Sequence, residues 1–148
     1  MKRIEVSLNL GVVAPLLDFI KPVLATLAQE TAFPPDMAQA DRELAGLWRE
    51  GLIHTQVEDC DRLMGLFDAE FFDSGRIALT EENGDAVLRA ASAIRLKLRE
   101  TCLEELSDAM LEGGDVNLGA LSEAERTGFG AYLFLATLQE IIIKHLGA

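Results

Sequence analysis

The sequence is poor in the residues that most often carry metal or nucleophilic chemistry. It holds two cysteines and two histidines in 148 residues. Cys60 and Cys102 are far apart and form no CxxC or Cys/His spacing, so neither a zinc site nor a disulfide framework is indicated. We expect both to be buried, reduced thiols. His145 falls in the expected last turn of a helix, where a cation is favoured by the helix dipole.

Basic residues are also scarce: 13 Lys and Arg stand against 25 Asp and Glu, for a net charge of −12. Because phosphate neutralisation dominates nucleic-acid affinity, this charge argues against a nucleic-acid partner, and against an anionic membrane surface. One segment, 86–99, is basic without any acid; it carries Arg89, Arg95, Lys97 and Arg99. We interpret it as a solvated helix face that offsets acidic neighbours, with a docking patch for an acidic partner as the alternative.

Motifs for catalysis and for targeting are missing as well. The chain has no Gly-x-Ser-x-Gly, no glycine-rich phosphate loop and no dinucleotide fingerprint. The paired Glu-x-x-His motifs of ferritin-like di-iron proteins are absent too. No run approaches the roughly 18 apolar residues of a membrane span, and polar residues interrupt the N-terminal segment. We therefore expect a cytoplasmic protein that is not an enzyme and carries no cofactor.

What is present predicts one mostly helical domain, 1–148. Apolar residues make up 49% and charged residues 26%, a globular balance. Residues 4–10 alternate apolar and polar as a half-buried strand does, and 76–79 is a second short strand that could pair with it. The expected fold is a helical bundle around a buried C-terminal helix, with these two strands as a ribbon.

Periodicity and breakers predict the remaining elements. A helix is expected over about 13–29, kinked at Pro22, followed by a rigid loop at 33–36. A helix starting near Met37 should carry Met37, Leu44, Leu47 and Trp48 on one apolar face and then kink or break at Gly51. A second stripe follows, made of Ile53, Val57, Cys60, Met64, Phe67 and Phe71, and ends in a turn at 73–75. One long helix is expected over about 82–111 with a stripe of Val87, Ala91, Ile94, Leu98 and Cys102, then a loop over 113–121.

The closing segment, 122–146, is the strongest helix signal. Ser122 and Glu125 form a capping box, and the helix that follows is apolar nearly all round, as a buried central helix is. Gln139 and Glu140 interrupt it. A buried carboxylate needs a cation, and Arg95 falls inside the apolar arc of its own helix, so we predict a buried Arg95–Glu140 ion pair. A functional role for either charge, in anion binding or catalysis, is the alternative.

One weak candidate metal site is present. Glu50, His54 and Glu58 are spaced by four residues, so one side of a helix could offer two or three ligands. A solvated helix face with an i,i+4 contact explains the same spacing.

The order of features resembles a bacterial domain-of-unknown-function family, known mainly from actinobacteria and often encoded beside the Clp protease adaptor. The likeness covers about residues 35–146: segments 42–52 and 60–66, the Ile94-Arg95-Leu96-Lys97-Leu98 core within 85–98, and the closing motif from Tyr132 to Glu140. The chain departs from the family at Lys97-Leu98-Arg99, where a less charged, glycine-containing stretch is usual. The resemblance implies a bacterial cytoplasmic protein connected with regulated proteolysis through gene neighbourhood alone, and no catalytic residue carries over.

Taken together, these observations favour an interaction or regulatory protein, expected to be a homodimer with an unidentified protein partner and without nucleic acid or membrane. The alternative is a small-molecule- or metal-binding protein, with or without enzymatic activity, that uses a pocket beneath Trp48 or the Glu50/His54/Glu58 face.

Overall fold

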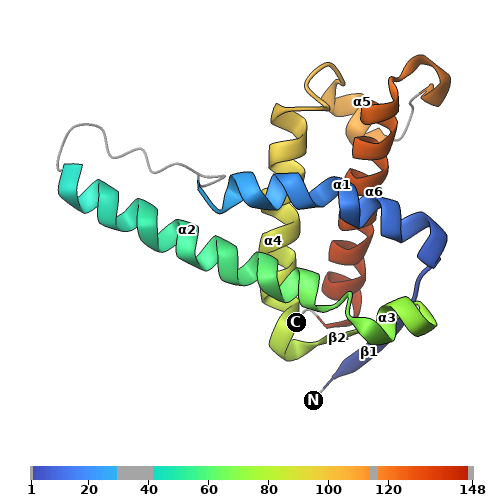
Figure 1. The fold of residues 1–148 in the computed structure, drawn as a ribbon, viewed down its shortest axis with the longest axis horizontal. Coiled ribbons are helices and arrows are strands. Elements are labelled where there is room, and N and C mark those ends of the chain that lie inside the picture. The colour runs from blue at the N-terminus through green and yellow to red at the C-terminus, as the bar shows by residue number, and fades with distance from the viewer. Residues whose placement is uncertain (1, 30–41, 114–116, 147–148) are drawn as a thin grey trace.

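The structure, a computed structural model, describes residues 2–29, 42–113 and 117–146, with the side chains of 42–45 and 112–113 outside the description. It is mostly helical with one two-stranded antiparallel sheet, which confirms the predicted fold class (Figure 1). The elements are β1 (Arg3–Ser7), α1 (Leu10–Leu27), α2 (Arg42–Gly65), α3 (Ala69–Ser74), β2 (Arg76–Thr80), α4 (Glu81–Glu100), α5 (Asp108–Gly113), a 3₁₀ turn (Leu118–Ala120) and α6 (Glu123–His145).

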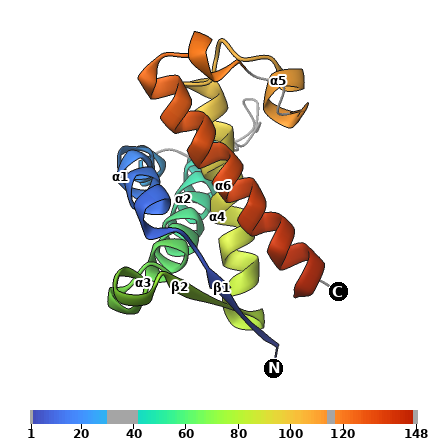
Figure 2. The same ribbon diagram turned by 90° about the vertical axis from the view of Figure 1, so that its right-hand side faces the viewer.

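Helices α4 and α6 form the centre of the molecule. They pack side by side, α1 lies across both, and α2 packs mainly on α4 (Figures 1 and 2). Small residues on α4 let its neighbours approach closely: Ala90, Ala91 and Ala93 are all buried. On α6, Gly128 does the same, because a Cβ there would lie 2.5 Å from the Cys102 sulfur. The core therefore depends on small side chains at its helix crossings.

The strands pair as the alternation predicted, with Arg3 opposite Thr80 and Ser7 opposite Arg76. Residues 8–10 do not extend β1, because Asn9 caps α1 and Leu10 begins the helix. Gly75 allows the turn between α3 and β2: its φ is 76°, and a Cβ there would lie 2.8 Å from the Leu8 carbonyl oxygen. That same approach lets the Gly75 carbonyl accept from the Leu8 amide at 2.8 Å.

Capping boxes begin both central helices. Thr80 and Asn83 exchange side chain to backbone hydrogen bonds at the start of α4. Ser122 and Glu125 do so at the start of α6, which confirms the prediction from sequence. The buried face of α6 includes Tyr132, Leu135 and Leu138, but Leu133 and Ile143 are exposed, so the helix is central on one side only.

The expected helix over 82–111 is two helices. α4 ends at Glu100, residues 101–106 are turns, and Ser107 caps the short α5 with a hydrogen bond from the Met110 amide. The break turns Leu103 and Leu106 inward, where they are 1% and 8% exposed. We infer that the burial of these two leucines favours the end of α4 at Glu100 over a helix that continues.

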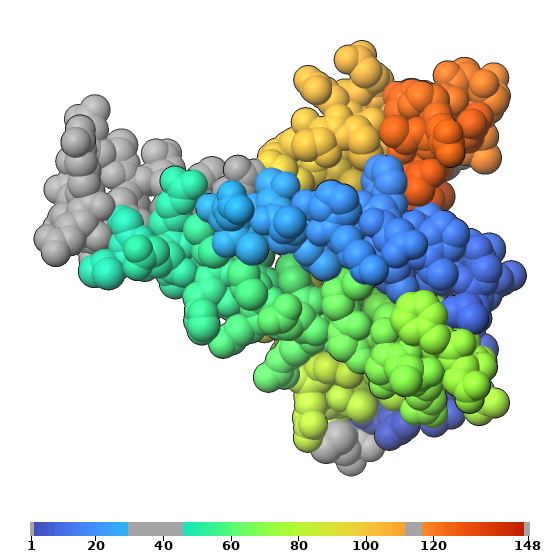
Figure 3. Space-filling view, viewed as in Figure 1, coloured from blue at the N-terminus to red at the C-terminus, as the bar shows by residue number. Residues whose placement is uncertain are grey.

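We expected a kink or a break at Gly51. The helix does not break there, because α2 is one helix from Arg42 to Gly65. Leu47 and Trp48, which we expected on one apolar face of this helix, are not covered: they are 62% and 50% exposed. The reason is that this half of α2 extends beyond α1 and α4 (Figures 1 and 3). The predicted loop at 33–36, Met37 and the Leu44 side chain lie outside the described residues.

Helix α1 is 18 residues long with a mean hydropathy of 1.7, enough by length and composition to cross a membrane. This corrects the expectation that no segment approaches such a length. Core helices and signal sequences pass the same test. Here Val13, Leu17, Ile20 and Leu27 are buried in the protein core.

Candidate functional site

An open, mostly apolar groove of about 320 Å³ lies between α2 and α4. The two helices contribute Leu52, Thr55, Gln56, Asp59, Leu88, Arg89, Ala90, Ser92 and Ala93. Alanines on α4 leave space that larger side chains would fill, and Gln56 is held by donating to the Leu27 carbonyl at 2.7 Å. Trp48 lies one turn before Leu52 on α2, so the groove is close to the place where a pocket was expected beneath that tryptophan.

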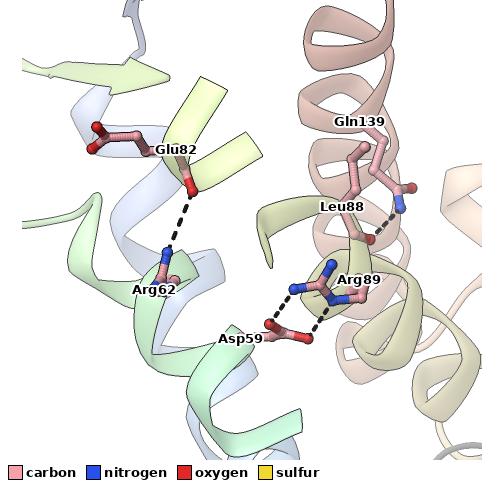
Figure 4. A network of polar contacts seen from close by, with 6 residues as sticks. All are labelled: Asp59, Arg62, Glu82, Leu88, Arg89 and Gln139. Carbon is pink, nitrogen blue, oxygen red and sulfur yellow. Dashed lines mark hydrogen bonds and ion pairs between the residues drawn. The ribbon is translucent and has the colours of Figure 1, made fainter. Parts of the chain in front are cut away.

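Asp59 and Arg89 form a bidentate ion pair at the groove (Figure 4). The Arg89 Nε and Nη2 atoms donate to the two carboxylate oxygens at 2.8 and 2.9 Å. The hydrogen bond to Asp59 raises the pKa of Arg89 above its ordinary value, so the guanidinium stays charged. The Asp59 side chain is 8% exposed and that of Arg89 is 57% exposed, so the carboxylate depends on this partner more than the guanidinium does.

The sequence reasoning missed this ion pair, in which the carboxylate is buried and the guanidinium is exposed. The sequence spacing could have indicated that Asp59 faces α4. It lies seven residues after Leu52 and four before Leu63, on the same stripe of α2. Nearby, Arg62 donates to the Glu82 carbonyl at 3.3 Å, a second link from α2 to the start of α4 (Figure 4).

Arg95 reaches from α4 to α6, as predicted, but its partner there is Gln139. Its Nη1 donates to the Gln139 amide oxygen at 2.6 Å, and its guanidinium lies over the Tyr132 ring, 4.4 Å from the centroid. The Gln139 nitrogen donates to the Leu88 carbonyl at 3.0 Å (Figure 4). It also donates to the Ser92 hydroxyl at 2.8 Å. The Arg95 Nε atom is buried and has no hydrogen-bond partner among the described residues.

The predicted buried Arg95–Glu140 ion pair is wrong, because Glu140 is exposed. Successive helix residues are 100° apart, so when Gln139 faces α4 its neighbour turns away from it. Arg95 and Glu140 do line one shallow surface groove, together with Ala136 and Ile143.

The basic residues of 86–99 do not form a separate patch. Arg89 pairs with Asp59 and Arg95 with Gln139. The other two also face acids, Lys97 with Glu100 at 3.9 Å and Arg99 with Asp108. Arg89, Lys97 and Arg99 thus offset acidic neighbours, as interpreted, whereas Arg95 contacts a neutral amide inside the α4–α6 contact.

The candidate metal ligands are not brought together as a site. His54 and Glu58 form an exposed pair at 2.9 Å, and Glu50 is exposed one turn earlier. Among the residues that the structure describes, no group of three or more His, Cys, Asp or Glu is placed to hold a metal ion.

Both cysteines are free, Cys60 buried and Cys102 partly buried. Burial, and then the charges of Asp59 and Asp61, raise the pKa of Cys60 to about 11. Burial also raises the pKa of Cys102. Neither thiol is activated as a nucleophile.

Comparison with known protein families identifies the family of this chain. It matches the family model "Domain of unknown function (DUF2017)" over residues 15–146, and the protein belongs to that family. This agrees with the domain-of-unknown-function family that the sequence resembles. Neither a similar curated protein nor a similar solved structure was found.

Proposed function

We propose that this chain is a non-enzymatic interaction or regulatory protein of the cytoplasm that works as a homodimer. The observation that carries the proposal is the N-terminal half of α2, which extends from the body of the molecule with Leu47 and Trp48 exposed (Figure 3). A helix gains most of its stability from packing an apolar face, and a contiguous exposed apolar surface marks an interaction site. A second copy of the chain would supply what this half of α2 packs against.

The placement of charged groups supports a binding role over a catalytic one. Arg89, Arg95 and Arg99 each contact a described partner across two elements, so they tie the fold together. The link with regulated proteolysis rests on the family resemblance alone, and no residue of the structure bears on it.

Sedimentation equilibrium at micromolar concentration tests the dimer. We expect twice the 16.1 kDa mass of the chain, and Trp48→Glu should return the single-chain mass. Phe72→Glu is the matched control, because Phe72 is equally exposed, at 51%, but lies on α3. A wild-type protein that sediments as a single chain would refute the proposal.

The groove between α2 and α4 favours a second candidate, the binding of a small apolar molecule. Its volume, about 320 Å³, is at the lower end of the range of about 300–1,000 Å³ for ligand pockets. Native mass spectrometry of the purified protein tests this candidate: a reproducible adduct lost on Ala93→Phe would support it, and the bare chain mass would oppose it.

A further inference from the structure

Trp48 and the groove share one side of α2. Trp48, Leu52, Thr55 and Asp59 follow one another in steps of four, three and four residues, which is a single stripe of a helix. The last three line the groove, whereas Trp48 lies one turn outside it and is 50% exposed. An exposed aromatic ring and an empty apolar groove therefore face the same direction.

The spacing between Trp48 and the groove allows two copies of α2 to fit each other. If two α2 helices pack antiparallel about a twofold axis near Leu52, position 48 of one lies opposite position 56 of the other. Each of these positions is four residues, about 6 Å, from the axis. The groove extends along α2 from Leu52 to Asp59, so its middle is level with Thr55 and Gln56. A twofold contact uses the same surface twice, so both tryptophans would meet a groove at once.

We propose that the groove is the receptor for the partner subunit's Trp48, so that each subunit completes the other across antiparallel α2 helices. This inference rests on the proposed homodimer and names its contact. The volume of about 320 Å³ suits one bulky side chain, and the walls are apolar, with Leu52, Leu88 and Ala93 among them. The Thr55 hydroxyl at the groove can accept a hydrogen bond from an indole N–H.

The areas indicate what else the dimer needs. Trp48 is already 50% covered in the single chain, so burying the rest of two such side chains removes roughly 150–250 Å² from water. A stable interface buries about 1,200–2,000 Å² in total. The facing sides of α2 must supply the rest. Buried aromatic anchors nevertheless carry a large share of binding energy, so loss of Trp48 should weaken the dimer at least tenfold.

The experiment uses two variants that fail for opposite reasons. Trp48→Ala removes the ring and leaves the groove open; Thr55→Tyr fills the groove from an exposed position and leaves the ring. Each variant alone should sediment as a single chain at a concentration where the wild type is a dimer. Mixed together they should form a heterodimer, because the ring of one finds the open groove of the other.

Fluorescence reads the contact directly, because Trp48 is the only tryptophan of the chain. In the mixture only the Thr55→Tyr chain is tryptophan-bearing, and its emission should shift to the blue and lose acrylamide quenching when the Trp48→Ala chain is added. His54→Tyr is the matched control: it adds the same ring at the neighbouring, exposed residue outside the groove and should dimerise as the wild type does.

The outcomes separate this inference from the proposed function. A wild-type dimer that both single variants still form, or a mixture in which emission does not change, would overturn the tryptophan contact and leave the homodimer standing. A wild type that stays a single chain would remove both. A small molecule that fills the groove of the wild-type dimer would also overturn the contact. Because Trp48→Ala changes an exposed residue, a Trp48→Ala chain that dimerises as the wild type does would overturn the contact even if Thr55→Tyr fails to fold.

Discussion

Arg95 donates a 2.6 Å hydrogen bond to Gln139, and this bond joins the two central helices. The acceptor is a neutral amide, which also donates to Ser92 and Leu88. One side chain of α6 therefore satisfies three groups of α4. Removing it leaves several polar groups unpaired, whereas removing exposed Glu140 leaves none.

We predict that Gln139→Leu destabilises the fold by about 1–3 kcal/mol, the usual cost of leaving buried polar groups without partners. Glu140→Ala should change the unfolding free energy by less than about 0.5 kcal/mol, as exposed substitutions do. Urea denaturation of both variants makes the comparison. Equal losses would mean that Glu140 contributes to the α4–α6 contact after all.

Substituting Arg89 should destabilise the fold more than substituting its partner Asp59. Arg89→Ala leaves a carboxylate that is 8% exposed without its cation, and we expect a loss of about 3 kcal/mol or more. Asp59→Ala leaves a guanidinium that is 57% exposed and can be hydrated, so the loss should be near 1 kcal/mol. Asp59→Leu with Arg89→Leu should recover much of the stability. Denaturation of both single variants measures these losses. A larger loss for Asp59→Ala than for Arg89→Ala would contradict the burial of the carboxylate.

Substitution by alanine should change the stability in opposite directions at two glycines. At Gly51 nothing lies within 4 Å of an added Cβ, so Gly51→Ala should stabilise the continuous helix α2 by about 0.5–1 kcal/mol. At Gly128 the added Cβ would meet the Cys102 sulfur at 2.5 Å, so Gly128→Ala should cost about 1–3 kcal/mol. Thermal unfolding measures both. Destabilisation by Gly51→Ala would show that α2 is not continuous there.

Cys60 should resist thiol reagents in the native protein, because only a small fraction is ionised near neutral pH when its pKa is about 11. The unfolded thiol ionises nearer its ordinary value of 9.0, so the unfolded state loses its proton first as pH rises. Stability should therefore fall between about pH 9 and 11. Cys60→Ala should lack this part of the decline. Rapid labelling of native Cys60 would show that the helix phase is wrong.

The sequence predicted those features that nearby residues determine. The capping box at Ser122, the pairing of the two strands and the stripe from Val87 to Leu98 depend on short spacings, and the structure has all three. The early end of α4 could not be read this way, because it follows from the burial of Leu103 and Leu106 against distant parts of the chain.

At the candidate site, too, local spacing predicted some features, whereas others depend on contacts between distant parts of the chain. That Arg95 belongs to the interior of the α4–α6 contact could be inferred from its place on the helix. Whether Gln139 or Glu140 receives it depends on which side of α6 packs on α4. Apolar residues flank both positions, Tyr132 and Leu135 near Gln139 and Leu133 near Glu140, so the pattern did not show which side is buried. The groove was harder still, because it arises from small residues of α4 facing α2, and a lack of side-chain volume leaves no motif.

The packing of α1 has a consequence during synthesis on the ribosome. Helix α1 contacts α2, α4 and α6, and α6 begins 96 residues after α1 ends. At about 5–20 residues per second, translation leaves the nascent α1 without its last partner for roughly 5–20 s. For that interval the emerging chain presents an 18-residue apolar helix of membrane-spanning length. Chaperones and targeting factors that sample nascent hydrophobic segments would meet α1 before α6 is available to pack against it.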